Sequence, residues 1–159
     1  MNKDVSGKDF KKIKLLGSGS TGDVYLVKNK DDKLYTMKII NKEKIITKKK
    51  LERIKTEREI LSKINHPFIV KMYHDWTDSN FIYFILDYCA GGDFFTLLRN
   101  IPDHKLSEDH TRFYCGELLL ALEYLHMHGC IHRDLKLENI LIHESGHIGH
   151  FWFGVICTF

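Results

Sequence analysis

A glycine-rich run near the start of the chain limits most strongly what it can fold into: Gly17-Ser18-Gly19-Ser20-Thr21-Gly22-Asp23-Val24. Glycines at this spacing let the backbone approach an anion closely, and exposed amides can hold negative oxygens. A dinucleotide-binding fold would need a helix straight after the glycines. Residues 24–27 (VYLV) instead continue as a strand. The run therefore predicts a strand–turn–strand unit, and a plain hairpin turn stays open for this motif alone.

Hydropathy predicts further strands in the first half of the chain, at residues 11–16, 34–40, 69–76 and 81–88. The first alternates polar and apolar side chains, as a half-buried strand does. Turns are expected at 29–33 (NKDDK) and 77–80 (TDSN), because both have turn compositions.

Helices are expected between and after these strands. One spans about 48–64 and ends before Pro67; its apolar stripe consists of Leu51, Ile54, Leu61 and Ile64. Asp93 is expected to cap a short helix that runs to Arg99, and Ser107 a longer one that ends at Gly129. The longer helix is apolar nearly all round at 118–125, which predicts burial on most sides. Strands followed by helices predict an α+β fold in two lobes.

Two charged residues lie in apolar surroundings, and a pairing between them would satisfy both charges. Lys38 lies between Met37 and Ile39 on a predicted strand. Glu57 lies on the apolar stripe of the first helix, where an unpaired carboxylate is costly. The alternatives are a solvated strand lysine and a glutamate that reaches water. We favour an ion pair between the two.

The most specific motif is His132-Arg133-Asp134-Leu135-Lys136-Leu137-Glu138-Asn139. In this pattern Asp134 can accept a hydroxyl proton and align the nucleophile, and Lys136 can neutralise charge on a moving phosphoryl group. Asn139 can hold a metal ion through its carbonyl oxygen. A chance match of this length downstream of the other motifs is very improbable.

Composition and charge exclude several classes of protein. The chain has 159 residues, of which 43% are hydrophobic and 28% charged, a normal globular balance. A net charge of +3 does not indicate nucleic acid, and no apolar run has the length of a signal peptide or a membrane span. We expect a reducing, cytoplasmic location.

Three histidines, His143, His147 and His150, allow a zinc site, but a surface hairpin is favoured. The basic run around Lys48-Lys49-Lys50 reads as a solvated helix face, with a phosphorylated partner segment as the alternative.

In their order, these motifs resemble the eukaryotic protein kinases, over about residues 10–148. Lys136 resembles the Ser/Thr class. Finer similarity to the AGC group lies in these segments: Thr56-Glu57-Arg58-Glu59-Ile60-Leu61, Asn65-His66-Pro67-Phe68-Ile69-Val70, Asp87-Tyr88-Cys89-Ala90-Gly91-Gly92-Asp93 and Gly146-His147-Ile148. The resemblance implies an antiparallel β N-lobe with one main helix (10–86), a hinge (87–92) and the first part of a helical C-lobe (93–159).

The resemblance also implies ATP and Mg²⁺ as cofactors and assigns site residues. Catalytic roles fall on Asp134, Lys136, Lys38 and Glu57, and Asn139 holds metal. The glycine run contacts ATP, with Leu86 as gatekeeper, Asp87 and Cys89 offering backbone groups to adenine, and Asp93 binding ribose. Val24, Thr36 and Leu141 sandwich the adenine ring; Thr36 replaces a usual alanine and narrows the roof slightly. The protein substrate, or a kinase partner, is not specified.

One departure from the family concerns the metal. Where Asp-Phe-Gly is expected, the chain has Trp152-Phe153-Gly154, and indole offers no oxygen to a hard cation. The sequence as given also lacks the segments that follow in the family. We therefore expect a truncated kinase domain that is inactive alone. The alternatives are a pseudokinase-like fragment that binds nucleotide or a partner, and a damaged or mispredicted gene product from about Gly149 on.

Overall fold

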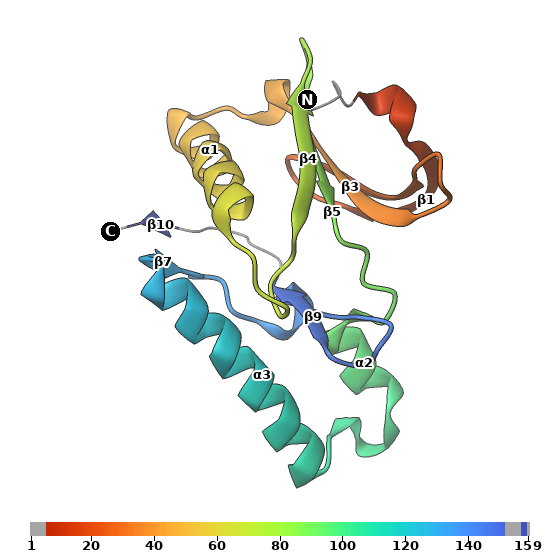
Figure 1. Cartoon of the computed structure of the whole chain (residues 1–159), viewed down its shortest axis with the longest axis vertical. Coiled ribbons are helices and arrows are strands. Elements are labelled where there is room, and N and C mark those ends of the chain that lie inside the picture. Colours follow the sequence, from red (N-terminus) through yellow and green to blue (C-terminus); the bar gives the residue numbers. More distant parts are fainter. Residues whose placement is uncertain (1–5, 152–156, 159) are drawn as a thin grey trace. The chain divides into compact units, whose positions relative to one another are not determined.

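The computed structural model describes residues 6–151 and 157–158, the last two and residues 150–151 by their backbone alone. The chain divides into two compact units, one of Met1–Glu52 with Lys71–Tyr88 and the other of Arg53–Val70 with Cys89–Phe159. Each unit is described by itself below. Figure 1 shows the β-rich and the helical parts of the chain.

The first unit is an antiparallel sheet of five strands in the order β1-β2-β3-β5-β4 (Figure 1). The strands are β1 (Lys11–Ser18), β2 (Gly22–Lys28), β3 (Leu34–Asn41), β4 (Met72–Thr77) and β5 (Phe81–Leu86), with short 3₁₀ turns at Gly7–Asp9 and Lys42–Lys44. Both predicted turns are present. Asn29 accepts backbone hydrogen bonds from Asp31 and Lys33, and Asp78 accepts them from Asn80 and Phe81.

Two expectations about this sheet are wrong in detail. β1 was expected to be half-buried, yet all eight of its residues are exposed, because β1 lies at the edge of the sheet. β4 begins at Met72 and not at residue 69. The N–H of Ile69 bonds to the carbonyl of His66 in the turn around Pro67, so Ile69 is buried without being part of a strand.

Buried side chains of β2, β3 and β5 form the core of this unit. Val27, Met37, Ile39 and Ile85 pack together, and aromatic rings surround them. Trp76 stacks on Tyr83 at 4.8 Å between ring centroids and on Phe10 at 6.2 Å. Such pairs add stability beyond the area that they bury.

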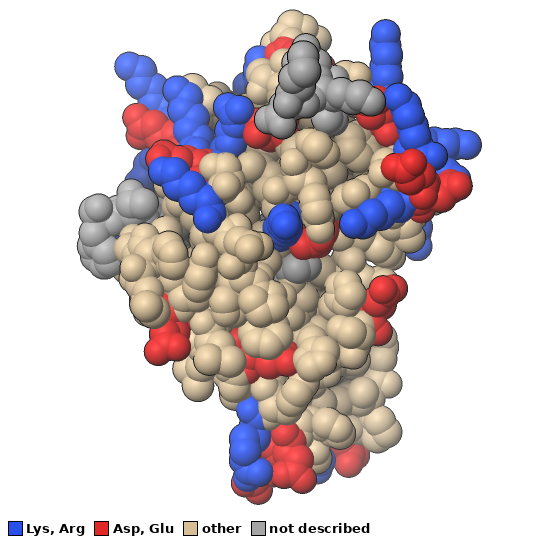
Figure 2. Space-filling model, in the orientation of Figure 1, with Lys and Arg blue, Asp and Glu red and all other residues tan. Residues whose placement is uncertain are grey.

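Helix α1 (Lys48–Lys63) ends four residues before Pro67, as predicted. Glu57, Ile60 and Leu61 are its buried residues. Of the expected stripe, Leu61 and Ile64 are buried and Ile54 is half-buried. Leu51, in the first turn, is 38% exposed. Lys and Arg side chains gather over α1 in Figure 2, in keeping with a solvated basic face.

The second unit contains the elements after the linker at Tyr88. They are β6 (Gly92–Asp93), α2 (Phe94–Asn100), η3 (Pro102–His104), α3 (Glu108–Met127), β7 (Cys130–Ile131), η4 (Leu137–Asn139), β8 (Ile140–Ile142), β9 (Ile148–Phe151) and β10 (Cys157–Thr158). Strands β6, β8 and β9 form one small sheet, and β7 pairs with β10 in another.

The predicted caps of both helices are confirmed. The Asp93 side chain accepts from the N–H of Thr96, and that of Ser107 from the N–H of His110. Gly129, with φ of 69°, follows the end of α3 in the left-handed conformation that glycine tolerates best.

The expected burial of α3 on most sides is wrong. Ala121 and Leu125 are fully buried, but Leu119 is 65% exposed and Leu120 52%. The two faces differ because only one of them packs on other parts of this unit. Among the helices of the described residues, none is long and apolar enough to cross a membrane.

Candidate functional site

The glycine-rich run forms the turn between β1 and β2. Ser18 lies opposite Asp23 in the strand pairing, and its hydroxyl donates to the Asp23 carboxylate at 2.7 Å. The N–H of Gly19 donates to the carbonyl of Gly22 at 2.8 Å. The turn with Ser20 and Thr21 at its tip is thus the predicted strand–turn–strand unit.

The glycines of this turn have different structural duties. A Cβ at Gly22 would lie 1.9 Å from the carbonyl oxygen of Ile39, so only glycine fits beside β3. A Cβ at Gly17 would meet nothing within 4 Å. The fold therefore requires glycine at position 22. It does not require glycine at position 17, so Gly17 has another reason to be glycine, such as the close approach of a ligand.

Four predicted residues lie on neighbouring strands of the same sheet. Val24 on β2 pairs with Lys38 on β3, and Thr36 on β3 pairs with Leu86 on β5. Thr36 and Leu86 are buried, and Lys38 is half-buried. The expected adenine roof and the expected phosphate-binding lysine thus share one patch of sheet.

Asp87 ties the end of β5 to the chain entering β4. Its carboxylate accepts from the hydroxyl of Tyr73 at 2.6 Å and from the N–H of Lys71 at 3.0 Å. Burial and the Asp87 hydrogen bond raise the pKa of Tyr73 well above its usual range. The N–H of Asp87 bonds to the Lys71 carbonyl, so its own carbonyl is the backbone group that it would offer to a ligand. The carbonyl of Cys89 accepts from Gly92.

In the second unit, Asp134, Lys136 and Asn139 come together. The amide nitrogen of Asn139 donates to the backbone carbonyl of Asp134 at 2.7 Å and to its carboxylate at 2.9 Å. The ammonium of Lys136 lies 3.2 Å from the same carboxylate. Hydrogen bonds from Asn139 and then from Lys136 lower the pKa of Asp134 below its ordinary value.

The loop that carries Asp134 is held by its own residues. The N–H of Asp134 donates to the ring of the buried His132 at 3.2 Å. Arg133 has a φ of 64°, a conformation that costs a non-glycine residue free energy and is frequent at functional sites. This arrangement presents an ionised carboxylate next to a cation and an amide, which suits a general base.

Asp93 and Leu141 lie opposite each other in the pairing of β6 with β8. Both carboxylate oxygens of Asp93 accept from Thr96, one from its N–H and one from its hydroxyl, each at 2.8 Å. A ribose hydroxyl would have to share these oxygens with the helix cap.

Other predicted residues are placed only in part. Glu57 is buried on α1, as expected from its position on the apolar stripe. Its pairing with Lys38 stays a prediction. Trp152, where the metal-binding aspartate was expected, lies outside the described residues.

For Mg²⁺, the side-chain oxygen of Asn139 is a donor of the kind that a hard cation prefers. The Asn139 amide nitrogen faces Asp134, so its oxygen is the atom for a metal. Of the three histidines in the zinc alternative, His150 has a side chain outside the described part of the chain. Among the residues that the structure does describe, no three His, Cys, Asp or Glu side chains cluster. His143 contacts Ser145, and His147 contacts Glu117.

Sequence reasoning missed Glu117, a buried carboxylate on α3 that bonds to His147 and to the N–H of Ile148. Its signal was available, since it is an acidic residue directly before the apolar stretch at 118–125. The partners, about thirty residues further along, could not be inferred from that pattern.

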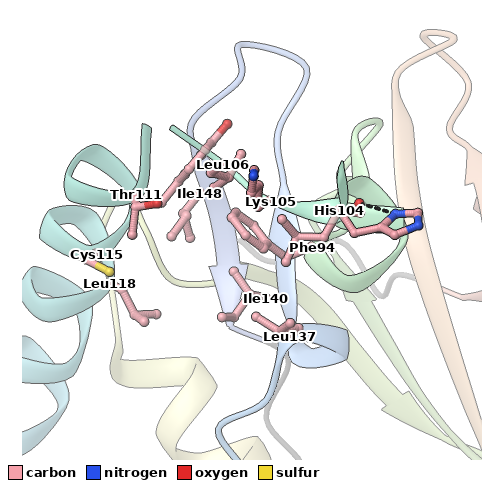
Figure 3. Close-up of a pocket in the computed structure, with 12 residues that line it drawn as sticks. Phe94, His104, Lys105, Leu106, Thr111, Cys115, Leu118, Leu137, Ile140 and Ile148 are labelled. Carbon is pink, nitrogen blue, oxygen red and sulfur yellow. Dashed lines mark hydrogen bonds between the residues drawn. The ribbon is translucent and has the colours of Figure 1, made fainter. Parts of the chain in front are cut away.

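An apolar cavity of about 360 Å³ lies in the second unit, between α2, α3 and the β8–β9 hairpin (Figure 3). Phe94, Leu118, Ile140 and Ile148 contribute to its lining. It contains none of the predicted site residues, although Leu137 belongs to the loop of Asp134.

Residues 10–159 match the family model described as "Protein kinase domain". The chain is 49% identical to Serine/threonine-protein kinase ppk22 of Schizosaccharomyces pombe over 91% of its length, and 46% identical to Flippase kinase 1 of Saccharomyces cerevisiae over 91%. It is 44% identical to the cAMP-dependent protein kinase catalytic subunit of Dictyostelium discoideum over 92%.

The match covers much less of these relatives themselves. The chain spans 28% of the first, 16% of the second and 22% of the third.

Proposed function

Because the chain belongs to the protein kinase family, we propose that it forms part of an ATP-dependent protein kinase that phosphorylates Ser or Thr hydroxyls. One of the relatives named above is a serine/threonine-protein kinase by name, and another is the catalytic subunit of a protein kinase, which supports that class. The observation that carries the proposal is the cluster in which Asn139 and Lys136 both contact the Asp134 carboxylate.

In this proposal each residue has one task. Asp134 accepts the proton of the attacking hydroxyl, and Lys136 neutralises charge on the transferred phosphoryl group. Lys38, paired with Glu57, holds ATP phosphates under the glycine-rich turn. When bound, Mg²⁺ neutralises the phosphate oxygens, and the Asn139 oxygen is the ligand that this chain offers to it.

The proposal also covers the division into lobes, the contacts with adenine and ribose, the protein substrate and the location. The lobes are taken as residues 10–86 and 93–159, with a hinge at 87–92. Adenine meets the carbonyl of Asp87 and the backbone of Cys89, and ribose meets Asp93. The protein substrate is a Ser- or Thr-containing protein, and the location is cytoplasmic.

ATP binding is tested by titration calorimetry of the 159-residue chain. Lys38→Ala should weaken ATP affinity about tenfold or more, because a charge-assisted contact to phosphate is lost. Lys44→Ala removes an exposed lysine of the same sheet unit and should leave affinity unchanged. Asp134→Asn should also bind ATP normally, since its task is in transfer. A wild-type chain that never binds nucleotide would refute the proposal for this chain.

A second candidate function, binding of nucleotide or of a kinase partner without transfer, is favoured by Trp152. Indole cannot replace the carboxylate at a magnesium ligand position. We expect no turnover from the 159-residue chain in a magnesium-dependent kinase assay. Trp152→Asp should make ATP affinity depend more strongly on Mg²⁺ in a calorimetric titration. Robust wild-type turnover that Asp134→Asn abolishes would contradict this expectation.

A further inference from the structure

Glu117 is the most deeply buried acidic residue whose contacts the proposed function does not use. The residue is 6% exposed, on the face of α3 that also carries Ala121 and Leu125. A carboxylate at such a place is costly unless hydrogen bonds satisfy both oxygens.

Both oxygens of Glu117 do have partners, and both partners lie at the start of β9. One oxygen lies 2.5 Å from the Nδ1 atom of His147, and the other accepts the backbone N–H of Ile148 at 2.7 Å. The His147 ring also packs against Phe113, one turn earlier on α3, at 5.4 Å. The buried carboxylate of Glu117 therefore fixes the position of β9.

A second contact from the same helix holds the tip of that hairpin. Tyr114, three residues before Glu117, donates its hydroxyl to the carbonyl of Gly146 at 3.2 Å. Gly146 has a φ of 85°, so the turn there adopts a conformation that most other residues would resist. Helix α3 therefore grips the β8–β9 hairpin at two successive points.

The β8–β9 hairpin directly follows the segment in which Asp134, Lys136 and Asn139 come together. Ile148 pairs with Ile142 at the end of β8, and β8 begins immediately after Asn139. The pairing has an irregularity between Leu141 and Ile142, so strand pairing alone does not impose a regular register there. A contact from outside the hairpin would therefore fix the register of β8 against β9.

We propose that Glu117 is a positioning residue for phosphoryl transfer: by anchoring β9 to α3 it holds β8, and through β8 the Asn139 amide against Asp134. This proposal rests on the proposed function only for what the anchor is used for. The position that Glu117 gives to β9 and Asn139 can be tested without nucleotide.

The test uses NMR on the 159-residue chain. Glu117→Ala should reduce hydrogen-exchange protection of the Ile148 amide about tenfold or more, since a hydrogen bond to a charged group is lost. It should also shift the side-chain amide signals of Asn139. Glu117→Gln keeps an acceptor oxygen for the Ile148 N–H and should restore most of the Asn139 signals. Glu123→Ala, an exposed change on the same helix, is the matched control.

The outcomes separate positioning from general stability. If Glu117→Ala lowers the protection of all amides equally, and the Asn139 signals stay in place well below the melting temperature, Glu117 is only structural and the proposal fails. If Glu117→Ala does not fold, Tyr114→Phe and His147→Asn each remove one contact of the same anchor. Unchanged Ile148 protection and unchanged Asn139 signals in both would equally overturn it. None of these readouts requires ATP binding, so failure of the proposed function is recognised separately, by calorimetry.

Discussion

At the scale of single residues, the charge state of Asp134 depends on two neighbours of unequal weight. The Asn139 hydrogen bond lowers its pKa most, followed by that of Lys136. A lowered pKa means that the stabilisation from this carboxylate is present above its ordinary pKa and is lost as the pH falls through the lowered value. The carboxylate is therefore ionised, as a base must be, throughout the neutral range.

Asn139→Ala should raise the pKa of Asp134 toward its ordinary value, because the largest stabilising contact to the ionised form disappears. Lys136→Met should raise it less. Carbon-detected NMR titration of the side-chain carboxyl measures both shifts. Glu144→Gln, on the hairpin turn, serves as the control and should leave the midpoint in place. A larger shift in Lys136→Met than in Asn139→Ala would reverse the assigned order of causes.

Gly22 and Gly17 separate the needs of the fold from those of a ligand. Gly22→Ala should destabilise the chain by about 1–3 kcal/mol, because its methyl group would collide with the Ile39 carbonyl oxygen. Gly17→Ala has room for its methyl group and should leave stability within about 1 kcal/mol. Urea unfolding measures both.

If the turn cradles phosphates, Gly17→Ala should nevertheless weaken ATP binding in a calorimetric titration. Normal ATP affinity in Gly17→Ala would show that the open space beside this glycine is not used for nucleotide.

At the scale of elements, Asp93 serves α2 as a cap and is expected to serve ribose as well. Asp93→Ala should cost about 1 kcal/mol of stability through loss of the cap. Asp93→Asn keeps an oxygen for the Thr96 N–H and should cost little. Urea unfolding measures the cap, and adenosine titration against adenine titration isolates the ribose contact. Equal losses of stability in both variants would show that the negative charge, and not the cap, stabilises α2.

At the scale of the whole molecule, the exposed face of α3 should govern behaviour in solution. Leu119, Leu120 and Met127 are more than half exposed on this helix. The cavity of Figure 3 adds further apolar surface to the same unit. Exposed apolar surface of this extent favours association. We expect a large part of the 159-residue chain to aggregate when it is expressed alone, so the solution measurements use its monomeric fraction.

Leu119→Lys should increase the monomeric fraction without unfolding the chain, because the side chain already faces solvent. Leu125→Lys buries an unpaired charge at a fully enclosed site and should unfold the helical unit. Size-exclusion chromatography with light scattering, together with circular dichroism, distinguishes the two results. A wild-type chain that is monomeric and melts cooperatively would contradict the expectation.

The local elements and much of the candidate site follow from the sequence alone. The five strands of the first unit, the helix ends at Asp93, Ser107 and Gly129, and the family itself were predictable. Each depends on short-range rules: side-chain period, capping chemistry and a motif read in order. The sequence placed Asp134 and Asn139 five positions apart in one motif, whereas the direct contact between their side chains was seen only in the structure.

Tertiary structure alone decided which apolar faces are covered and which distant groups meet. Leu119 and Ala121 lie two positions apart in one apolar run, yet one is 65% exposed and the other fully buried. The need for glycine at position 22 comes from a carbonyl on the next strand. Glu117 meets Ile148 across thirty-one positions. A sequence pattern records the period of an element but not what packs against it, because that depends on contacts between segments far apart in the chain.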